Sequence, residues 1–315
     1  MSRLRRVAAS LALLLGVTLA AGCGTSGSND DSEGGQPQGA ALRITLGTQE
    51  FPEARILGEL WRQALAVNGY TVDLRKGIGP AADLDRRLRD DDIDGHVAYT
   101  GTVLSVVAKQ EVSGLDPQAT YQRAKKFYAG RDMVMSEMTP FQNKDAIATS
   151  RTFAQREGLR SIADLKRLTS LKLGARPEFE DLYLGVKGLE QRYSLTGIRF
   201  SPLELGKQYA ALDDGTVQAV DAFTTDPALR DGDYQLLSDP ELLFGSQNVV
   251  MTVRRDKLRK IGGRKFVAVV SEVNRRLTQQ AMVDMNAAVT DGEDEETVAR
   301  RFLREAGLLD PYGGE

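Results

Sequence analysis

Reactive side chains are scarce in this 315-residue sequence, which has one cysteine, Cys23, and one histidine, His96. A single cysteine cannot form a disulfide within the chain, and structural zinc sites need several Cys or His ligands. A single histidine also weakens the case for a His-based catalytic triad. The composition therefore argues against most enzyme classes, and we expect neither catalysis nor a metal or other cofactor. We expect His96 to be structural.

Long basic runs are absent too. The formal net charge is −3, and it becomes more negative if Arg3, Arg5 and Arg6 are removed with an N-terminal signal. Proteins that bind nucleic acid concentrate Lys and Arg, because they must neutralise phosphates. We therefore expect no nucleic-acid partner.

The apolar run from Val7 to Ala21 is too short and too rich in small residues to span a membrane. A basic start, a short apolar run and small residues before a cleavage point are typical of a secretory signal. Cys23 follows directly, which resembles a bacterial lipobox, where the thiol is acylated and becomes the first mature residue. We predict a lipoprotein signal peptide over 1–22 and lipidation of Cys23. The alternative is an ordinary signal peptide with an incidental cysteine.

Residues 23–40 contain almost nothing that can enter a core, and Gly, Ser and acidic residues dominate them. Such stretches behave as flexible linkers. We therefore expect a domain tethered to the outer face of the cytoplasmic membrane. The roughly 270 residues that follow are enough for two lobes.

Strand-like and helix-like segments alternate from residue 42 onward, which is typical of an α/β fold. The spacing of apolar residues predicts strands at 42–47, 70–74, 93–99, 145–149, 171–175, 219–223 and 248–253. It predicts helices at 53–68, 81–89, 118–128, 151–157, 185–193, 206–213, 266–277, 278–288 and 295–306. We expect one lobe from 41–144 and 251–315, and a second lobe from 145–250.

A succession of short motifs then resembles the osmoprotectant-binding proteins of ABC importers, in order and over essentially the whole mature chain. The motifs are Gly47-Thr48-Gln49-Glu50-Phe51-Pro52-Glu53, Tyr99-Thr100-Gly101-Thr102, Pro177-Glu178-Phe179, Tyr209-Ala210-Ala211-Leu212 and Asp221-Ala222-Phe223-Thr224-Thr225-Asp226. The resemblance implies a type II periplasmic-binding-protein fold, with two lobes joined by two crossover strands. It also implies an extracytoplasmic protein that captures glycine betaine, choline or a related cation. The implied partners are that solute and an ABC permease with a cytoplasmic ATPase.

The resemblance also implies a binding cage with one tyrosine from each of four segments. Tyr99 matches, and Thr102 matches a hydroxyl that helps to bind the polar end of the ligand. The other tyrosine positions fall on Asp145, with Asn143 nearby, on Phe223 and on Gln247. Gln49 lies where relatives place a polar group facing the ligand, and the position of a cationic anchor falls near Leu182. The predicted binding residues are Gln49, Tyr99, Thr102, Asn143, Asp145, Phe223 and Gln247.

Two of the four rings are therefore missing from the expected positions. One hypothesis is a cationic ligand that is partly paired with Asp145. The alternative is that Asp145 is a solvated residue at the end of a strand and that the pocket uses other rings. Tyr183 and Arg176 are candidates to replace, from a shifted position, the cationic anchor that is missing near Leu182. A changed ligand (an amine, a polyol or an aromatic solute) and a sensory or scavenging role without a permease also remain open.

Overall fold

The computed structural model describes residues 42–204 and 206–309. The predicted signal peptide, the lipidation site Cys23 and the linker lie outside these residues. The described residues belong to one compact unit. Within the described ranges, none of the helices combines the length and apolar character that a membrane-spanning helix requires.

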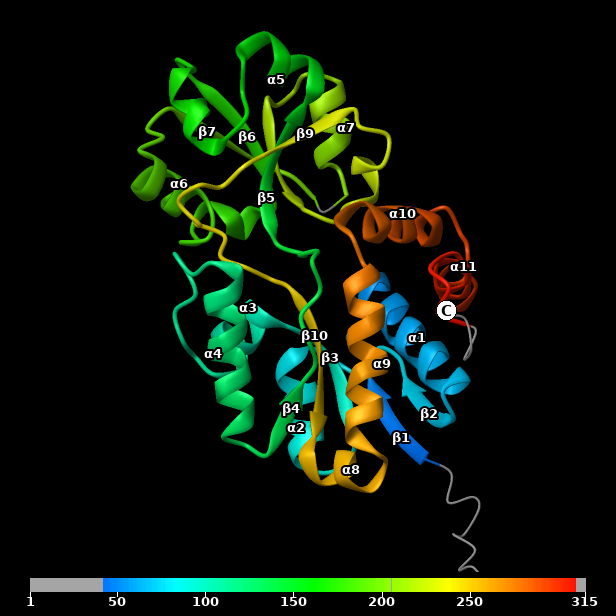
Figure 1. The fold of residues 1–315 in the computed structure, drawn as a ribbon. Coiled ribbons are helices and arrows are strands. Elements are labelled where there is room, and N and C mark those ends of the chain that lie inside the picture. Colours follow the sequence, from blue (N-terminus) through cyan, green and yellow to red (C-terminus); the bar gives the residue numbers. More distant parts are fainter. Residues whose placement is uncertain (1–41, 205, 310–315) are drawn as a thin grey trace, which may run out of the picture. The chain divides into compact units, whose positions relative to one another are not determined.

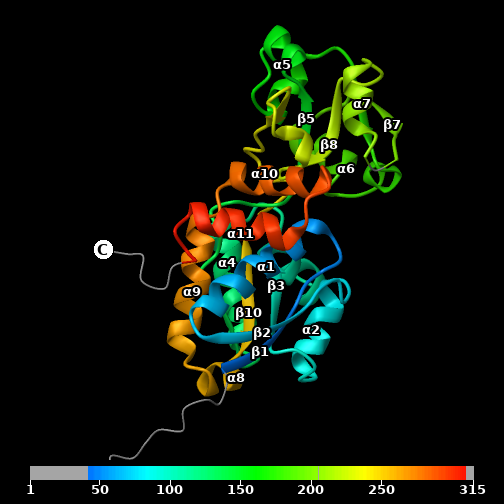
Figure 2. The ribbon, with the colours of Figure 1, turned by 90° about the vertical axis from the view of Figure 1, so that its right-hand side faces the viewer.

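The first sheet has the strand order β2-β1-β3-β10-β4. Its strands are β1 (Leu42–Gly47), β2 (Tyr70–Arg75), β3 (Gly95–Tyr99), β4 (Met133–Met135) and β10 (Val249–Arg254). β1 pairs in parallel with β2 and β3, whereas β10 is antiparallel to both β3 and β4. Helices pack on both faces of this sheet, as Figures 1 and 2 show. They are α1 (Pro52–Val67), α2 (Ala81–Arg89), α3 (Thr100–Thr102), α4 (Pro117–Ala129), α8 (Arg255–Lys260) and α9 (Gly263–Arg276).

The second sheet has the order β7-β6-β8-β5-β9. Its strands are β5 (Asp145–Ser150), β6 (Leu171–Ala175), β7 (Ile198–Pro202), β8 (Ala219–Phe223) and β9 (Tyr234–Leu237). Its helices are α5 (Arg151–Glu157), α6 (Val186–Tyr193) and α7 (Gln208–Asp213). Short helical turns with 3₁₀ or π geometry occur at 103–107, 162–167, 177–180 and 227–229.

We call the two sheets with their helices the first and second lobes. Each lobe has its own apolar cores, one on each face of its sheet. Two crossing segments, 136–144 and 238–248, join the lobes and pair with each other. Gln142 forms an antiparallel bridge with Asn248, and the backbone N–H of Asn143 donates to Gln247 O at 3.1 Å. The predicted double crossover is confirmed. The predicted lobe boundaries stay a prediction, and β10 itself begins at Val249.

Helix α1 illustrates how the sequence determines an element. Pro52 occupies its first turn, where a missing N–H costs nothing. Its apolar residues recur at helical spacing, and the buried set comprises Ile56, Leu57, Leu60, Trp61, Ala64 and Leu65. Trp61 is core, as predicted, and its indole N–H donates to Asn274 Oδ1 on α9 at 2.9 Å. His96 is also buried, with Nδ1 2.8 Å from Val97 O.

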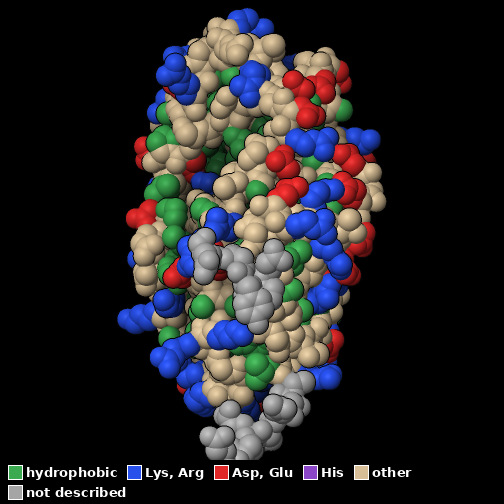
Figure 3. All heavy atoms as spheres, turned by 45° about the vertical axis from the view of Figure 1, so that its right-hand side comes forward, with side chains coloured by type: hydrophobic (Ala, Val, Ile, Leu, Met, Phe, Trp, Pro, Cys, Tyr) green, Lys and Arg blue, Asp and Glu red, His purple; other side chains and the backbone are tan. Residues whose placement is uncertain are grey.

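Two C-terminal helices, α10 (Gln279–Thr290) and α11 (Glu295–Glu305), complete the described chain. Helix α10 packs against α1, α11 and the turn at 227–229 of the second lobe. Asn286 on α10 donates both to Glu53 of α1 and to Thr225 O of the second lobe. One face of the molecule, shown in Figure 3, carries acidic and basic side chains interspersed.

Candidate functional site

A cavity of about 220 Å³ lies where the crossing segments meet both lobes. All seven predicted binding residues line it, although they come from segments up to 198 positions apart in the chain. The other lining residues are Phe51, Gly101, Ser105, Val112, Lys144, Leu184, Phe244 and Ser246. This volume is below the ~300–1,000 Å³ that is typical for drug-sized ligands, so it suits a small solute.

Four aromatic rings line this cavity: Tyr99, Phe223, Phe51 and Phe244. The sequence identified the first two and missed the other two. The rings of Phe51 and Tyr99 lie 5.7 Å apart, and 36% of Phe51 is exposed. Phe244 is buried and stacks on Phe179 at 6.4 Å. Both missed residues stand close in sequence to predicted ones, because Phe51 follows Gln49 and Phe244 precedes Gln247.

Glu53 holds Tyr99 in place. The Tyr99 hydroxyl donates to Glu53 Oε1 at 2.9 Å, so the ring rather than the hydroxyl is available to a ligand. The same carboxylate accepts from Asn143 Nδ2 at 3.0 Å and from Asn286 Nδ2 at 3.0 Å. Burial raises the pKa of Glu53, and these donors oppose the rise. Asn143 Oδ1 has no hydrogen-bond partner among the described residues, so the cavity offers a ligand one buried acceptor.

Thr102 and Gln247 form hydrogen bonds with each other, so they contribute to the cavity wall as a pair. The backbone N–H of Thr102 donates to Gln247 Oε1 at 3.0 Å, and Gln247 Nε2 donates to Thr102 Oγ1 at 3.1 Å. Their approach requires glycine at position 101, because a Cβ there would lie 2.5 Å from Ser246 O. This contact connects the first lobe directly to the second crossing segment.

Asp145 is paired with an arginine. Arg176 Nη1 donates to Asp145 Oδ1 at 3.1 Å and also to Asp221 Oδ2. The guanidinium carbon lies 5.9 Å from the centre of the Phe223 ring, and Asp145 pairs with Phe223 across strands β5 and β8. Burial raises the pKa of Asp221 to about 8, and the neighbouring Asp145 carboxylate adds to the rise. Asp145 is therefore not a solvated strand end, and a ligand would meet an already paired carboxylate.

Lys144 adds a cation that sequence reasoning did not select. Its Nζ donates to Gly245 O at 3.3 Å and lies 3.9 Å from Asp239 Oδ2. Burial lowers the pKa of this ammonium, and Asp239 opposes the change. Leu182 and Tyr183, near the expected position of the cationic anchor, are more than 40% exposed and do not line the cavity. Lys144 is thus the cation in the cavity wall.

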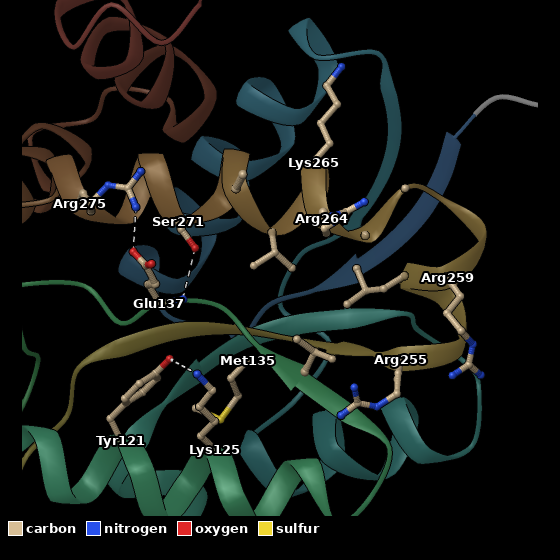
Figure 4. Close-up of a pocket in the computed structure, with 16 residues that line it drawn as sticks. Tyr121, Lys125, Met135, Glu137, Arg255, Arg259, Arg264, Lys265, Ser271 and Arg275 are labelled. Carbon is tan, nitrogen blue, oxygen red and sulfur yellow. Dashed lines mark hydrogen bonds and ion pairs between the residues drawn. The ribbon is translucent and has the colours of Figure 1, made fainter.

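Two larger hollows lie elsewhere. One, of about 530 Å³, shares Phe51, Asn143 and Phe223 with the site and extends along α10. The other, of about 960 Å³, lies on the first lobe between α4, α8 and α9, and none of its lining residues belongs to the site (Figure 4). Among the described residues, no group of three or more His, Cys, Asp or Glu side chains is placed to hold a metal ion.

Comparison with known proteins identifies the family. Residues 43–305 match the model of the substrate-binding domain of ABC-type glycine betaine transport systems. The chain belongs to this family. The predicted resemblance is therefore confirmed, and the family is one of solute-binding proteins.

An individual relative shows low sequence identity to this chain. The chain is 23% identical over 269 residues to the ergothioneine transport permease/ergothioneine binding protein EgtU of Helicobacter pylori (strain G27). That match covers 84% of this chain and 48% of the relative, so the chain spans about half the length of this curated protein.

Two solved structures share the fold. A glycine betaine/carnitine/choline ABC transporter structure superposes with a TM-score of 0.78 at 20% identity, covering 85% of this chain and 100% of that one. The apo form of YehZ from Escherichia coli superposes with a TM-score of 0.74 at 21% identity, covering 86% of this chain and 100% of that one. These similarities confirm the predicted type II periplasmic-binding-protein fold.

Proposed function

We propose that the protein captures a small zwitterionic solute that carries a quaternary ammonium group, and hands it to an ABC permease driven by a cytoplasmic ATPase. The observation that carries this proposal is the cavity with four aromatic rings and a lysine in its wall. A quaternary ammonium group has no N–H to donate, so aromatic faces are its natural partners. Lys144 supplies a counter-charge for a carboxylate at the other end of such a solute.

The Asp145–Arg176 pair supports a zwitterion over a simple dication. A free carboxylate in the wall would favour an excess of positive charge on the ligand. Because Arg176 holds Asp145 at 3.1 Å, that part of the wall is closer to neutral. The wall as a whole then offers rings to the cationic end, and the Lys144 ammonium and polar side chains to the anionic end.

The proposal extends to the location of the protein. A signal peptide over 1–22, lipidation at Cys23 and a linker to residue 40 would tether the binding unit on the outer face of the cytoplasmic membrane. Tethering raises the effective concentration of the protein near its permease. The proposed role is binding without catalysis, and what supports it is that the chain belongs to a family of solute-binding domains.

Ergothioneine is a second candidate solute. This compound combines a trimethylammonium group and a carboxylate with a planar thione ring. The unpartnered Asn143 Oδ1 would accept from a ring N–H, and the neighbouring hollow of about 530 Å³ would provide room for the ring. The name of the relative from Helicobacter pylori, an ergothioneine binding protein, supports this candidate.

Calorimetric titration of the purified protein with glycine betaine, choline, ergothioneine, a polyamine and a polyol tests the proposal. We expect saturable binding of a quaternary ammonium solute, and no turnover of the solute during the titration. Binding of the polyol or the polyamine, with no heat from any quaternary ammonium compound, would reject it. Identifying the genes next to this one tests the permease partner separately.

A further inference from the structure

The hollow of about 960 Å³ on the first lobe is a groove with cations on its rim, which we call the basic groove. Its floor is apolar and comprises Val134, Met135, Leu258, Val267 and Ala268. Its rim carries six cations and one carboxylate: Lys125, Arg255, Arg259, Arg264, Lys265, Arg275 and Glu137 (Figure 4). This excess of positive charge contrasts with the negative net charge of the whole chain.

Several of these cations are not neutralised. Glu137 is already paired with Arg275, at 2.8 Å. The nearest carboxylate to Arg255 belongs to Asp132, at 3.9 Å. Among the described residues, no carboxylate lies within 4.0 Å of Arg259 or Arg264, and both side chains are exposed. The guanidinium groups of Arg259 on α8 and Arg264 at the start of α9 are thus available to bind an anion, and Arg255 beside them has only the long contact with Asp132.

The position of Arg264 adds to this argument. Helix α9 begins at Gly263 and carries Arg264 and Lys265, with no acidic residue, in its first turn. Cations at this end oppose the helix dipole, which favours negative charge at an N-terminus. An external anion in the groove would offset that cost. The floor behind these side chains combines Val134 and Met135 of β4, Leu258 of α8, and Val267 and Ala268 of α9.

The groove also lies where the described chain begins. Leu42 pairs with Tyr70 in the sheet, and the Tyr70 hydroxyl lies 3.4 Å from Gly262 O, which lines the groove. Figures 1 and 2 both place the first residues of β1 near α8. In the sequence, this end is the one that leads back to the predicted lipidation site, Cys23. A lipid anchor would therefore bring this end of the first lobe to a membrane surface.

We propose that the basic groove docks on anionic phospholipid headgroups. Guanidinium groups donate paired hydrogen bonds to phosphate oxygens, which suits them to phospholipids. Basic residues close to an anionic leaflet are attracted by its surface potential, and this attraction fades within a Debye length. The groove would then act as a second membrane contact beside the anchor and would set the orientation of the lobe. This inference rests on the proposed function only in so far as that function places the protein at a membrane.

Vesicle sedimentation tests the inference. The protein without residues 1–23 is mixed with vesicles of phosphatidylglycerol and phosphatidylcholine, or of phosphatidylcholine alone, at low and high salt. We expect binding to the anionic vesicles only, and weaker binding at high salt. The variant Arg255→Glu/Arg259→Glu/Arg264→Glu should bind at least about tenfold more weakly, because each charge contributes separately. The matched control is Arg156→Glu/Lys166→Glu/Lys172→Glu on the second lobe, which changes the net charge equally.

The outcomes separate the explanations. Equal binding by the groove variant and the wild type, or equal losses in both variants, would overturn the proposal. Tight binding of inorganic phosphate in the absence of vesicles, or a preference for polyglutamate over vesicles, would also overturn it in favour of a free anion or an acidic protein. Circular dichroism checks folding, and Arg259→Gln/Arg264→Gln replaces the triple variant if that one unfolds. Since no solute is present, failure here leaves the proposed function untouched.

Discussion

At the scale of single residues, the proposed site depends on side chains that no local pattern marks as ligands. Lys144 and Phe244 line the cavity because they lie on the crossing segments, and Phe51 lines it from the connection between β1 and α1. Glu53 and Arg176 hold lining residues in position through hydrogen bonds: Glu53 positions Tyr99, and Arg176 positions Asp145. Three experiments at this scale test the site.

Removing the exposed ring at position 51 should weaken solute binding without destabilising the fold. We expect Phe51→Ala to lose about 0.5–2 kcal/mol of binding free energy for a quaternary ammonium solute, the usual range for one cation–π contact. Calorimetry measures this change. Tyr183→Ala is the matched control, because Tyr183 is 41% exposed and lies outside the cavity. Equal affinity for Phe51→Ala and the wild type would remove Phe51 from the site.

Lys144 should discriminate between solutes with and without a carboxylate. Lys144→Met removes the ammonium but keeps most of the side-chain length. We expect it to cost about 1.5–3 kcal/mol for glycine betaine, as for a hydrogen bond to a charged group. Choline has a hydroxyl in place of the carboxylate and should lose much less. Parallel losses for both solutes would show that Lys144 maintains the cavity rather than binding the carboxylate.

The Asp221 carboxyl should make the binding of a cation depend on pH. Its pKa is raised to about 8 by burial and by Asp145, so it is protonated and neutral below that pH. Ionisation adds a negative charge to a cluster that already contains Asp145, Asp226, Glu178 and the single cation Arg176. We therefore expect the affinity for choline to rise between about pH 6 and pH 9.

Titration calorimetry at several pH values measures that slope. Asp221→Asn cannot ionise and should remove it. Choline is the right probe because it has no carboxylate, so that loss of the proton from Lys144, whose pKa is lowered by burial, does not weaken its binding and mask the expected rise. A wild-type affinity that is flat or falls over this range would contradict the assignment.

At the scale of secondary-structure elements, the site depends on the contact between α3 and the second crossing segment. Gly101 allows that contact, since a Cβ there would lie 2.5 Å from Ser246 O. Gly101→Ala should therefore destabilise the fold by about 1–3 kcal/mol through overpacking, and should weaken solute binding as well. Denaturant unfolding measures the loss. Gly130→Ala is the control, because its added Cβ would meet nothing closer than 3.6 Å. Similar effects of both substitutions would refute the close-approach argument.

Most elements were predictable from apolar spacing; among the helices α3 and α8 were missed, and the three strands that were missed share a physical feature. The strands at 171–175 and 219–223 agree with β6 and β8, which are central strands with buried side chains. The missed strands β4, β7 and β9 are all sheet edges of three to five residues. An edge strand buries little and needs no strong alternation, so the sequence carries only a weak signal for it.

The residues of the site were only partly predictable from the sequence. The seven residues that the resemblance assigned do lie around one cavity. Their partners do not follow from the sequence, because Arg176 reaches Asp145 across 31 positions and Gln247 reaches Thr102 across 145. The missing rings illustrate the same limit. Two phenylalanines from other segments line the cavity in their place, which a position-by-position comparison cannot detect.

At the scale of the whole molecule, the structure separates two kinds of recognition. Both lobes and both crossing segments contribute to the proposed solute site, so a bound solute would bridge the lobes. The basic groove lies on the first lobe alone and shares no lining residue with the solute site. We therefore expect solute binding and docking on lipids to be independent. Occupation of one site should not change the affinity of the other, because distant sites without shared partners rarely couple.

The most direct test of the central claim compares a quaternary ammonium solute with its neutral isostere. Choline and 3,3-dimethylbutan-1-ol have the same shape, but only choline carries a positive charge. If the four rings form a cation site, calorimetry should detect choline binding and at least about tenfold weaker binding of the alcohol, since several cation–π contacts are lost together. Equal affinity for the two compounds would show that the cavity selects shape alone, and it would contradict the proposed function.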